Sequence, residues 1–195
     1  MGFSFEIIAS NIDEDEIQIR YSDPRKIVRS LARAKAQHVF GSVHETDCNS
    51  VRTPGDGGTV VIGSDQILAL SSATGIKLLG KPITAAGACR QLKICSGQTA
   101  KLITGVHLEG ALHKAGGAPW QFRKTWVHEV KLQFRDLSAR EISEYVQLDQ
   151  PLQCAGSFKF EDHGISLFSS VQTDDPTGIE GLPLLRLNRE LLSLA

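Results

Sequence analysis

The residue types that could do chemistry gather just after a short apolar run. Asp65 and Gln66 follow Val60–Gly63 and Ser64. A run of β-branched residues that reaches glycine predicts a buried strand ending at a ligand-facing edge, because glycine lets another group approach the backbone closely. Asp65 is therefore the first candidate for chemistry. From this stretch alone, the alternative that Asp65 only caps a turn carries equal weight.

A lysine on a predicted helix is the second candidate. Asp23 and Pro24 are typical of a helix start, with the aspartate as cap and the proline in the first turn. Lys35 lies four residues after Leu31 and eight after Ile27, so helical geometry places it on the buried side. Other inward positions of this helix are Val28 and Val39. A lysine on that side either extends its ammonium group to the surface or meets an anion.

The other elements follow from periodicity and turn signals. Strands are expected at 3–8, from 60, and at 102–108, 126–134, 154–159 and 165–168. Helices are expected from Thr84 to 97, from Ser138 to 146, and from Pro183 with Leu184, Leu187 and Leu191 buried. Residues 11–16 and 41–58 are interpreted as loops. Strands and helices alternate in the early part of the chain, and strands cluster in the late part. This order predicts an α/β fold, with a mixed, twisted sheet flanked by helices.

Composition narrows the class of protein. The chain has 195 residues, 41% of them hydrophobic, which suits one domain spanning 1–195. Its 21 basic and 22 acidic residues argue against general binding to nucleic acid or to a membrane surface. The cysteines, Cys48, Cys89, Cys95 and Cys154, lack metal-site spacing and are interpreted as reduced thiols. With no apolar run long enough for a membrane helix, a soluble, cytoplasmic protein is expected.

Short motifs occur in a fixed order over nearly the whole chain: Ile12–Glu14, Leu31–Ala36, Gly63–Gln66, Gly80–Pro82, Ser96–Gly97, Cys154–Lys159 and Gly181–Leu184. Taken in this order, they resemble the Maf family of nucleotide pyrophosphatases. Each motif alone is weak, and their order carries the resemblance. The family implies a fold related to inosine triphosphatases, an active-site cleft, a divalent metal and, in most members, a dimer.

The resemblance also implies roles for individual residues. Asp65 would act as general base or hold a metal-bound water, and Glu14 would help Asp65 to hold the metal, magnesium or manganese. Magnesium suits such a site, since it takes one or two carboxylates plus phosphates. Lys35 and Lys81 would neutralise phosphate charge while a nucleoside triphosphate is cut between its α and β phosphates.

Two further positions resemble the branch of the family that hydrolyses 7-methyl-GTP. Gln66 and Glu161 match the positions that separate this branch from those preferring thymidine or uridine nucleotides. A carboxylate suits 7-methylguanine, because methylation at N7 makes the base cationic and a good donor. Alternatives are a dTTP or UTP pyrophosphatase, or a non-catalytic nucleotide-binding or cell-division-associated protein.

Plainer interpretations stand beside these roles. Glu14 lies in a run of four acidic residues, which is usually a solvated loop. Lys81 would be an exposed turn residue and Glu161 an ordinary hairpin charge. His128, on an apolar strand face, is interpreted as a hydrogen-bonded core residue rather than a metal ligand.

The start of the chain departs from the family pattern. An opening strand and a Ser-x-Ser-x-x-Arg-Arg turn come before the segment that Gly2–Phe5 resembles, and this sequence lacks them. The turn would supply phosphate-binding donors, and the strand would belong inside the sheet. We therefore expect the chain as printed to be a poor enzyme, with either an upstream start or a shortened form that binds weakly or pairs with another chain.

Overall fold

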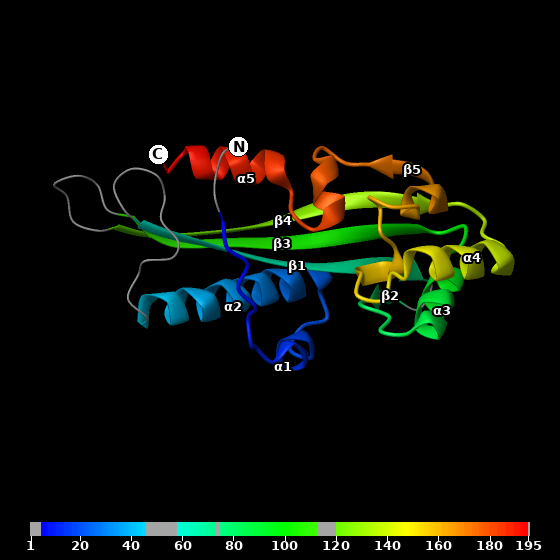
Figure 1. The fold of residues 1–195 in the computed structure, drawn as a ribbon, viewed down its shortest axis with the longest axis horizontal. Coiled ribbons are helices and arrows are strands. Elements are labelled where there is room, and N and C mark those ends of the chain that lie inside the picture. Colours follow the sequence, from blue (N-terminus) through cyan, green and yellow to red (C-terminus); the bar gives the residue numbers. More distant parts are fainter. Residues whose placement is uncertain (1–4, 46–57, 73–74, 113–119, 195) are drawn as a thin grey trace. The chain divides into compact units, whose positions relative to one another are not determined.

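A five-stranded antiparallel sheet organises the chain. The computed structural model describes residues 5–45, 58–72, 75–112 and 120–194. The strands are β1 (Gly58–Ser72), β2 (Gly75–Leu79), β3 (Thr99–Leu112), β4 (Trp120–Phe134) and β5 (Phe168–Gln172). They lie side by side in the order β2-β1-β3-β4-β5 (Figure 1). The predicted α/β class, with one sheet flanked by helices, is confirmed, and its described strands are antiparallel where a mixed sheet was expected.

The chain divides into two compact units. The first comprises the described parts of residues 1–65 and 105–127, and the second comprises those of residues 66–104 and 128–195. The boundary falls between Asp65 and Gln66. Strands β1, β3 and β4 therefore each contribute one part to either unit, and that one domain spans 1–195 stays a prediction.

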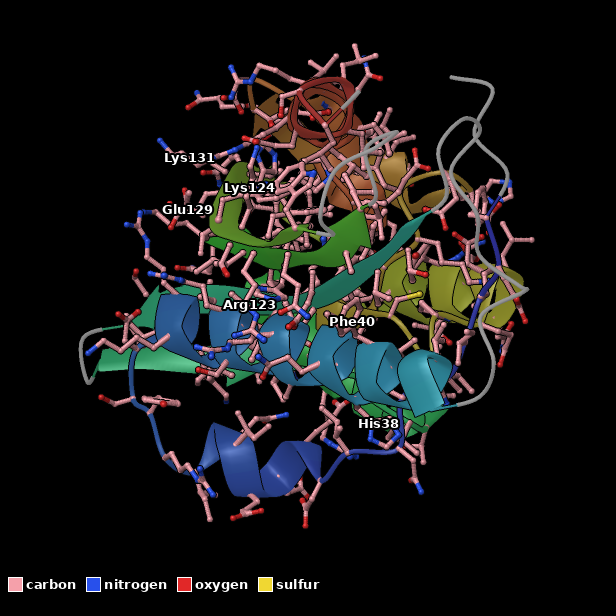
Figure 2. The ribbon with its side chains drawn as sticks, turned by 90° about the vertical axis from the view of Figure 1, so that its left-hand side faces the viewer. His38, Phe40, Arg123, Lys124, Glu129 and Lys131 are labelled. Atoms are coloured by element: carbon pink, nitrogen blue, oxygen red, sulfur yellow. The ribbon has the colours of Figure 1, made fainter. Side chains whose placement is uncertain are left out.

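The first unit contains α1 (Glu14–Gln18) and α2 (Pro24–Glu45). As predicted, α2 begins at Pro24, and the carboxylate of Asp23 accepts a bond from the backbone N–H of Arg25 at 2.9 Å. All four predicted inward residues of α2 are buried: Ile27, Val28, Leu31 and Val39. Further along, Phe40, labelled in Figure 2, packs against a small cluster formed by Ala36, Val39, Val43 and Val61.

Three expectations for the first unit are wrong. Residues 5–8 form no strand, and Phe5 and Ile7 are 81% and 88% exposed. An alternating apolar pattern forms a strand only when a neighbouring strand pairs with it, and the local sequence does not supply that partner. The acidic segment is the short helix α1 rather than a loop, because Asp13 caps it by accepting from the Glu16 N–H at 3.0 Å. Of the loop expected at 41–58, residues 41–45 belong to α2 and residue 58 begins β1, while residues 46–57 lie outside the described parts.

The second unit holds α3 (Ala85–Cys95), α4 (Ala139–Asp149) and α5 (Leu184–Leu192). Both predicted caps are confirmed: Thr84 caps α3, and Ser138 forms a capping box with Glu141. The core of this unit joins the sheet to α3 and α4, with Phe134, Leu92, Leu132 and Leu167 among its fully buried side chains. In α5 only Leu187 is fully buried.

The segment from 154 to 168 also differs from its prediction. Residues Ala155–Ser157 and Gly164–Leu167 are short 3-10 helices, and β5 begins only at Phe168. Gly156 and Ser157 both have positive φ angles, of 75° and 64°, which a strand does not allow. A third 3-10 helix, η3 (Pro176–Glu180), precedes α5. Among the described residues, we find no helix whose length and hydropathy would suit a membrane span.

Candidate active site

Two glycines let α2 lie directly on the strands of the first unit. A Cβ atom at Gly63 of β1 would overlap the carbonyl oxygen of Ala32 and come within 2.9 Å of the Ala36 Cβ. A Cβ at Gly105 of β3 would overlap the carbonyl of Val28. These contacts on α2 are four residues apart and so share one face of the helix. The group that approaches Gly63 is therefore the α2 backbone, and β1 does not end there as expected but runs on to Ser72.

This close seating brings three of the predicted site residues together. The Lys35 Nζ lies 2.7 Å from Asp65 Oδ1 and 2.9 Å from Glu14 Oε1. The Lys35 and Asp65 side chains are only 20% and 12% exposed, whereas Glu14 is 41% exposed. One ammonium group from α2 thus joins a carboxylate on β1 to a carboxylate on α1. Of the two alternatives for Lys35, the structure gives a lysine that meets anions.

The two carboxylates decide the charge of Lys35. Burial is the largest single influence and lowers the pKa of Lys35, because the charged form loses hydration. The charges and hydrogen bonds of Asp65 and Glu14 together outweigh burial, so this pKa stands above its ordinary value. Lys35 therefore remains an ammonium group throughout the physiological range.

Gln66, the next residue of β1, makes its contacts within the second unit. Its Nε2 donates to Thr104 Oγ1 at 2.8 Å and to the carbonyl of Gly178 at 2.9 Å. Within the described part of the chain, its carbonyl oxygen Oε1 accepts no hydrogen bond. The two bonds of Nε2 thus hold the Gln66 amide in place, and Oε1 remains available as an acceptor.

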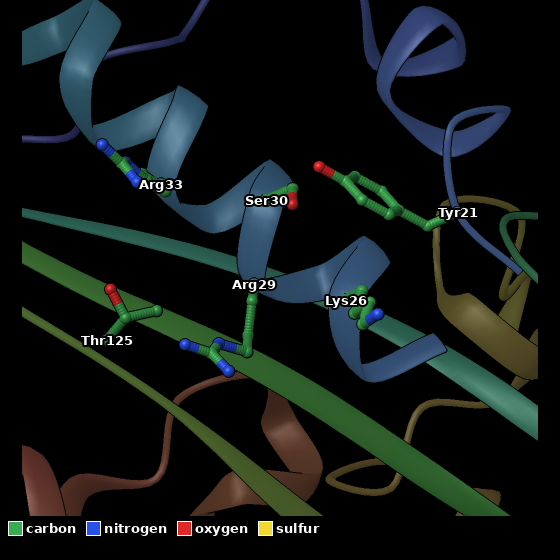
Figure 3. A pocket seen from close by; sticks show the side chains of 6 residues that line it. All are labelled: Tyr21, Lys26, Arg29, Ser30, Arg33 and Thr125. Atoms are coloured by element: carbon green, nitrogen blue, oxygen red, sulfur yellow. The ribbon is translucent and has the colours of Figure 1, made fainter. Parts of the chain in front are cut away.

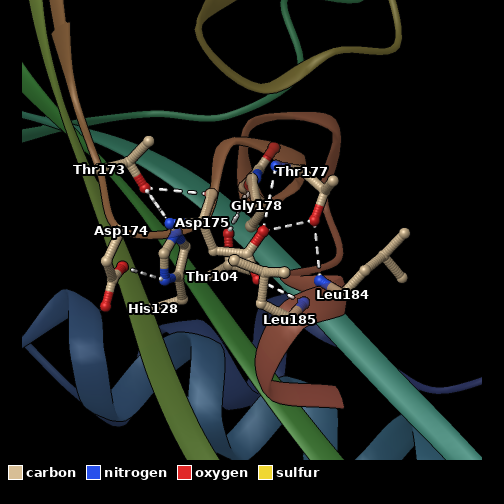
Figure 4. Close-up of polar contacts among 10 residues, drawn as sticks. Thr104, His128, Thr173, Asp174, Asp175, Thr177, Gly178, Leu184 and Leu185 are labelled. Atoms are coloured by element: carbon tan, nitrogen blue, oxygen red, sulfur yellow. Dashed lines mark hydrogen bonds and ion pairs between the residues drawn. The ribbon is translucent and has the colours of Figure 1, made fainter. Parts of the chain in front are cut away.

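A polar network fixes the η3 segment to which Gln66 bonds (Figure 4). The Asp175 carboxylate, only 4% exposed as a residue, accepts from the Thr177 N–H and hydroxyl and from the Leu185 N–H at 2.7 Å. His128 Nε2 lies 3.1 Å from the Thr173 hydroxyl, and the imidazole fills the space beside Gly178. The interpretation of His128 as a hydrogen-bonded core residue is confirmed.

Lys81 and Glu161 are exposed, and the charges of both act on one thiol of the second unit, Cys154. Burial raises the pKa of Cys154 first, the Glu161 charge raises it further, and the Lys159 and Lys81 charges oppose them. Backbone bonds hold the two motifs together: the Gly156 N–H donates to the Gly80 carbonyl at 3.3 Å. Lys159 was not among the predicted site residues, although it closes the Cys154–Lys159 motif and carries a second positive charge to this cluster.

A strained turn follows Lys81. Ile83 has a φ of 64°, which costs a β-branched residue free energy. The turn is closed across Ile83, because the Thr84 N–H donates to the Pro82 carbonyl at 2.7 Å. The Ile83 N–H also donates to the Leu152 carbonyl at 3.0 Å. Strain of this kind is held where the surroundings over-determine the backbone, here between Lys81 and the start of α3.

The structure therefore forms two groups from the six predicted residues. Glu14, Lys35 and Asp65 are in contact in the first unit, and the charges of Lys81 and Glu161 both act on Cys154 in the second. Gln66 lies with Thr104 and Gly178. Among the described residues, no three histidine, cysteine, aspartate or glutamate side chains are placed to hold a metal by themselves. A metal here would need ligands from a substrate in addition to Glu14 and Asp65.

Comparison with known proteins agrees with the order of the motifs. The family described as Maf-like protein matches residues 1–194. A 7-methyl-GTP pyrophosphatase of Nitrosococcus oceani is 40% identical over all of this chain and 84% of its own length. A nucleoside triphosphate pyrophosphatase of Acinetobacter baylyi is 38% identical over all of this chain and 86% of its own, and a 7-methyl-GTP pyrophosphatase of Pseudomonas putida is 40% identical over 90% and 79%. The chain therefore belongs to the Maf family.

Proposed function

We propose that this protein is a nucleoside triphosphate pyrophosphatase that hydrolyses 7-methyl-GTP to the monophosphate and pyrophosphate. The observation that carries the proposal is the contact of Lys35 with both Glu14 and Asp65, at the positions where the family resemblance expects phosphate and metal chemistry. The names of the Nitrosococcus and Pseudomonas relatives support the choice of substrate.

The reaction needs few groups from the protein. Water attacks the α-phosphorus, the bond to the oxygen bridging the α and β phosphates breaks, and pyrophosphate leaves with that oxygen. In our proposal Asp65 accepts the proton of the attacking water, and Lys35 offsets the charge of the phosphates. Both side chains are mostly buried, which strengthens these interactions because less water screens them.

A divalent cation fits the first group by its donor chemistry. Oxygens of Glu14 and Asp65 converge on the single Nζ of Lys35, so two hard carboxylate ligands already surround one positive charge. Glu14 and Asp65 would hold magnesium or manganese together with substrate oxygens. When bound, the cation would neutralise phosphate charge and polarise the phosphoryl oxygens.

We propose that Gln66 and Glu161 recognise the base. The Gln66 Oε1, which accepts no hydrogen bond from the described residues, and the exposed carboxylate of Glu161 suit the N–H groups that 7-methylguanine presents. Because the methylated base is cationic, a carboxylate favours it over neutral guanine. Lys81 is proposed to bind phosphate.

The test compares pyrophosphate release from 7-methyl-GTP, GTP, dTTP and UTP by the full-length protein with magnesium. The proposal expects 7-methyl-GTP to be turned over fastest. Asp65→Asn should lower kcat by about 10² or more, since a base or metal ligand is lost. Asp15→Asn is the matched control, because Asp15 is an exposed carboxylate of α1 and should leave kcat unchanged.

Two outcomes would contradict the proposal. Faster turnover of dTTP or UTP would assign the protein to another substrate class of the family. Binding of nucleotide in calorimetry without pyrophosphate release would support the non-catalytic alternative. A homodimer and a cytoplasmic location remain predictions, the first of which light scattering of the purified protein would check.

A further inference from the structure

The outward face of α2 carries a row of positive charges. Lys26, Arg29 and Arg33 are all exposed and fall at spacings of three and four residues, so they share one side of the helix. With Tyr21, Ser30 and Thr125 they line a cavity of about 290 Å³ in the first unit (Figure 3). In Figure 3 Arg29 extends from the helix over the strands, and the Tyr21 hydroxyl points toward Ser30.

Lys35 has counter-charges that these three cations do not have within the described part of the chain. Across the described residues, no carboxylate forms an ion pair with Lys26, Arg29 or Arg33. Like charges at such spacing repel one another, so the row is unfavourable in the free protein. An anion in the cavity would remove this repulsion. The lining offers two guanidinium groups, one ammonium group and three hydroxyl groups, which are donors that phosphate oxygens accept well.

A buried imidazole lies directly behind the cavity. His107 is 2% exposed, and its Nδ1 lies 2.6 Å from the hydroxyl of the cavity residue Thr125. Its Nε2 is buried, has no hydrogen bond among the described residues, and faces the Glu109 carboxylate at 3.4 Å. The orientation of the Thr125 hydroxyl therefore depends on His107: when Nδ1 carries a proton it donates to Thr125, and the hydroxyl proton is then free to point into the cavity.

We propose that this cavity binds a small anion with linked phosphates, of which inorganic pyrophosphate is the simplest. Three cations on one wall favour a ligand with more than one negative charge over a monoanion. Tyr21 at the rim offers a face on which the base of a nucleoside diphosphate would stack. The site is separate from the contacts of Lys35, and the proposal does not rest on the proposed function.

His107 supplies a local reporter of occupancy. Burial lowers the pKa of His107 first, Glu109 opposes it, and the charges of Arg33 and Arg123 lower it further. An anion beside Arg33 would offset one of these charges. Filling the cavity should therefore raise the pKa of His107, a change that binding at Lys35 alone would not produce.

The experiment combines calorimetry with NMR of the His107 ring in the full-length protein without metal. Pyrophosphate, ADP and sulfate are titrated separately. The double variant Arg29→Gln/Arg33→Gln should weaken pyrophosphate binding by about tenfold or more and abolish the upward shift of the His107 titration. Arg90→Gln, which removes an exposed arginine of α3, is the matched control and should bind as the wild type does.

Further arms separate the possible readings. Lys35→Gln should retain the His107 response, which distinguishes this cavity from the candidate active site. Tighter binding of ADP than of pyrophosphate would identify a nucleotide as the occupant, and the reverse would identify free pyrophosphate. Arg33→Lys keeps the charge and the fold but loses the planar fork, and weaker binding by this variant supports the site if the double variant fails to fold.

Unchanged binding and an unchanged His107 response in the double variant would overturn the proposal. So would a response to RNA or to anionic vesicles with none to pyrophosphate or ADP, since the row would then serve a polymer or a surface. A response to sulfate equal to that to pyrophosphate would also contradict it, because linked phosphates would have no advantage.

Discussion

At the scale of single residues, Lys35 shows how an ordinary helix lysine becomes part of a site. Its spacing alone predicts a place on the buried side of α2, and this prediction is confirmed. Its partners could not be derived from spacing. Asp65 lies 30 residues away and meets Lys35 only because Gly63 lets α2 approach β1. Without the motif resemblance, Glu14 would have been assigned to a solvated acidic loop.

Lys35 should make stability fall at high pH. Because its pKa in the folded protein is raised above 10.5, its stabilising contribution is complete below pH 10.5 and is lost as pH rises through the folded value. Asp65→Asn should lower the stability at neutral pH by about 1–3 kcal/mol, since it removes much of this contribution. That value lies between those for surface and for buried ion pairs. Urea unfolding from neutral pH to above pH 10.5 measures it.

The comparison with Asp15→Asn isolates Lys35 from the other groups that titrate at alkaline pH. That control should lose stability as steeply as the wild type, whereas Asp65→Asn should lose it less steeply. Equal slopes in all three proteins would mean that the contacts of Lys35 contribute no net stability.

At the scale of elements, the close contact of α2 with β1 depends on a missing side chain. Gly63→Ala should destabilise the protein by about 1–3 kcal/mol, because the added methyl group overlaps the Ala32 carbonyl and must displace the helix. Activity should fall as well, since Lys35 moves with α2. Urea unfolding and kcat of the same preparation check both effects.

Gly41→Ala is the matched control for this prediction. Gly41 lies within α2 with nothing within 4 Å of its added Cβ, so alanine should stabilise the helix by up to about 1 kcal/mol. Loss of stability of the same size in both variants would show that α2 does not depend on contact at Gly63.

The turn at Ile83 should be improvable. Replacing a β-branched residue at φ 64° by glycine relieves about 1–2 kcal/mol, and the flexibility of glycine costs about 0.5–1, so Ile83→Gly should stabilise the protein by roughly 0.5–1 kcal/mol. Ile76→Gly, an equally exposed change in β2, should destabilise it. A lower unfolding midpoint for Ile83→Gly would mean that the Ile83 side chain has a packing role.

Elements whose signals are local were predicted well, and those set by distant contacts were not. Thr84 and Ser138 were recognised as caps because the capping atoms lie within three residues. The 3-10 turn at Ala155–Ser157 was mistaken for a strand, since its conformation depends on Gly156 fitting against Leu68 and on the bond to the Gly80 carbonyl. Residues 5–8 have the alternating pattern of a strand but form no strand in the described structure.

At the scale of the whole molecule, sequence predicted the α/β class and the family but not the division into two units. The order of the motifs identified the family, and the family model matches nearly the whole chain. The division falls inside three long strands, between residues such as Asp65 and Gln66 that are consecutive in sequence. The sequence patterns of these strands continue across the boundary between the units, so no local sequence signal marks it.

Alkylation of one thiol, Cys95, should report the unfolding of the second unit. Cys95 is fully buried, and burial raises its pKa to about 12, so it should resist alkylation in the native protein at neutral pH. Brief iodoacetamide treatment along a urea series, followed by mass spectrometry, should give labelling of Cys95 only where this core unfolds. Cys89 on the same helix is part-buried and serves as the internal comparison. Equal labelling of both thiols without urea would contradict the prediction.

The two charged faces of α2 differ in how they respond to ionic strength. Lys35 is half-buried between Glu14 and Asp65, and dissolved ions reach such a pair poorly. Lys26, Arg29 and Arg33 are exposed, and at about 0.15 M salt their fields are screened beyond roughly 8 Å. A rise in salt concentration therefore weakens the outer row while leaving the inner contacts nearly intact, so one helix carries a salt-sensitive and a salt-resistant set of cations.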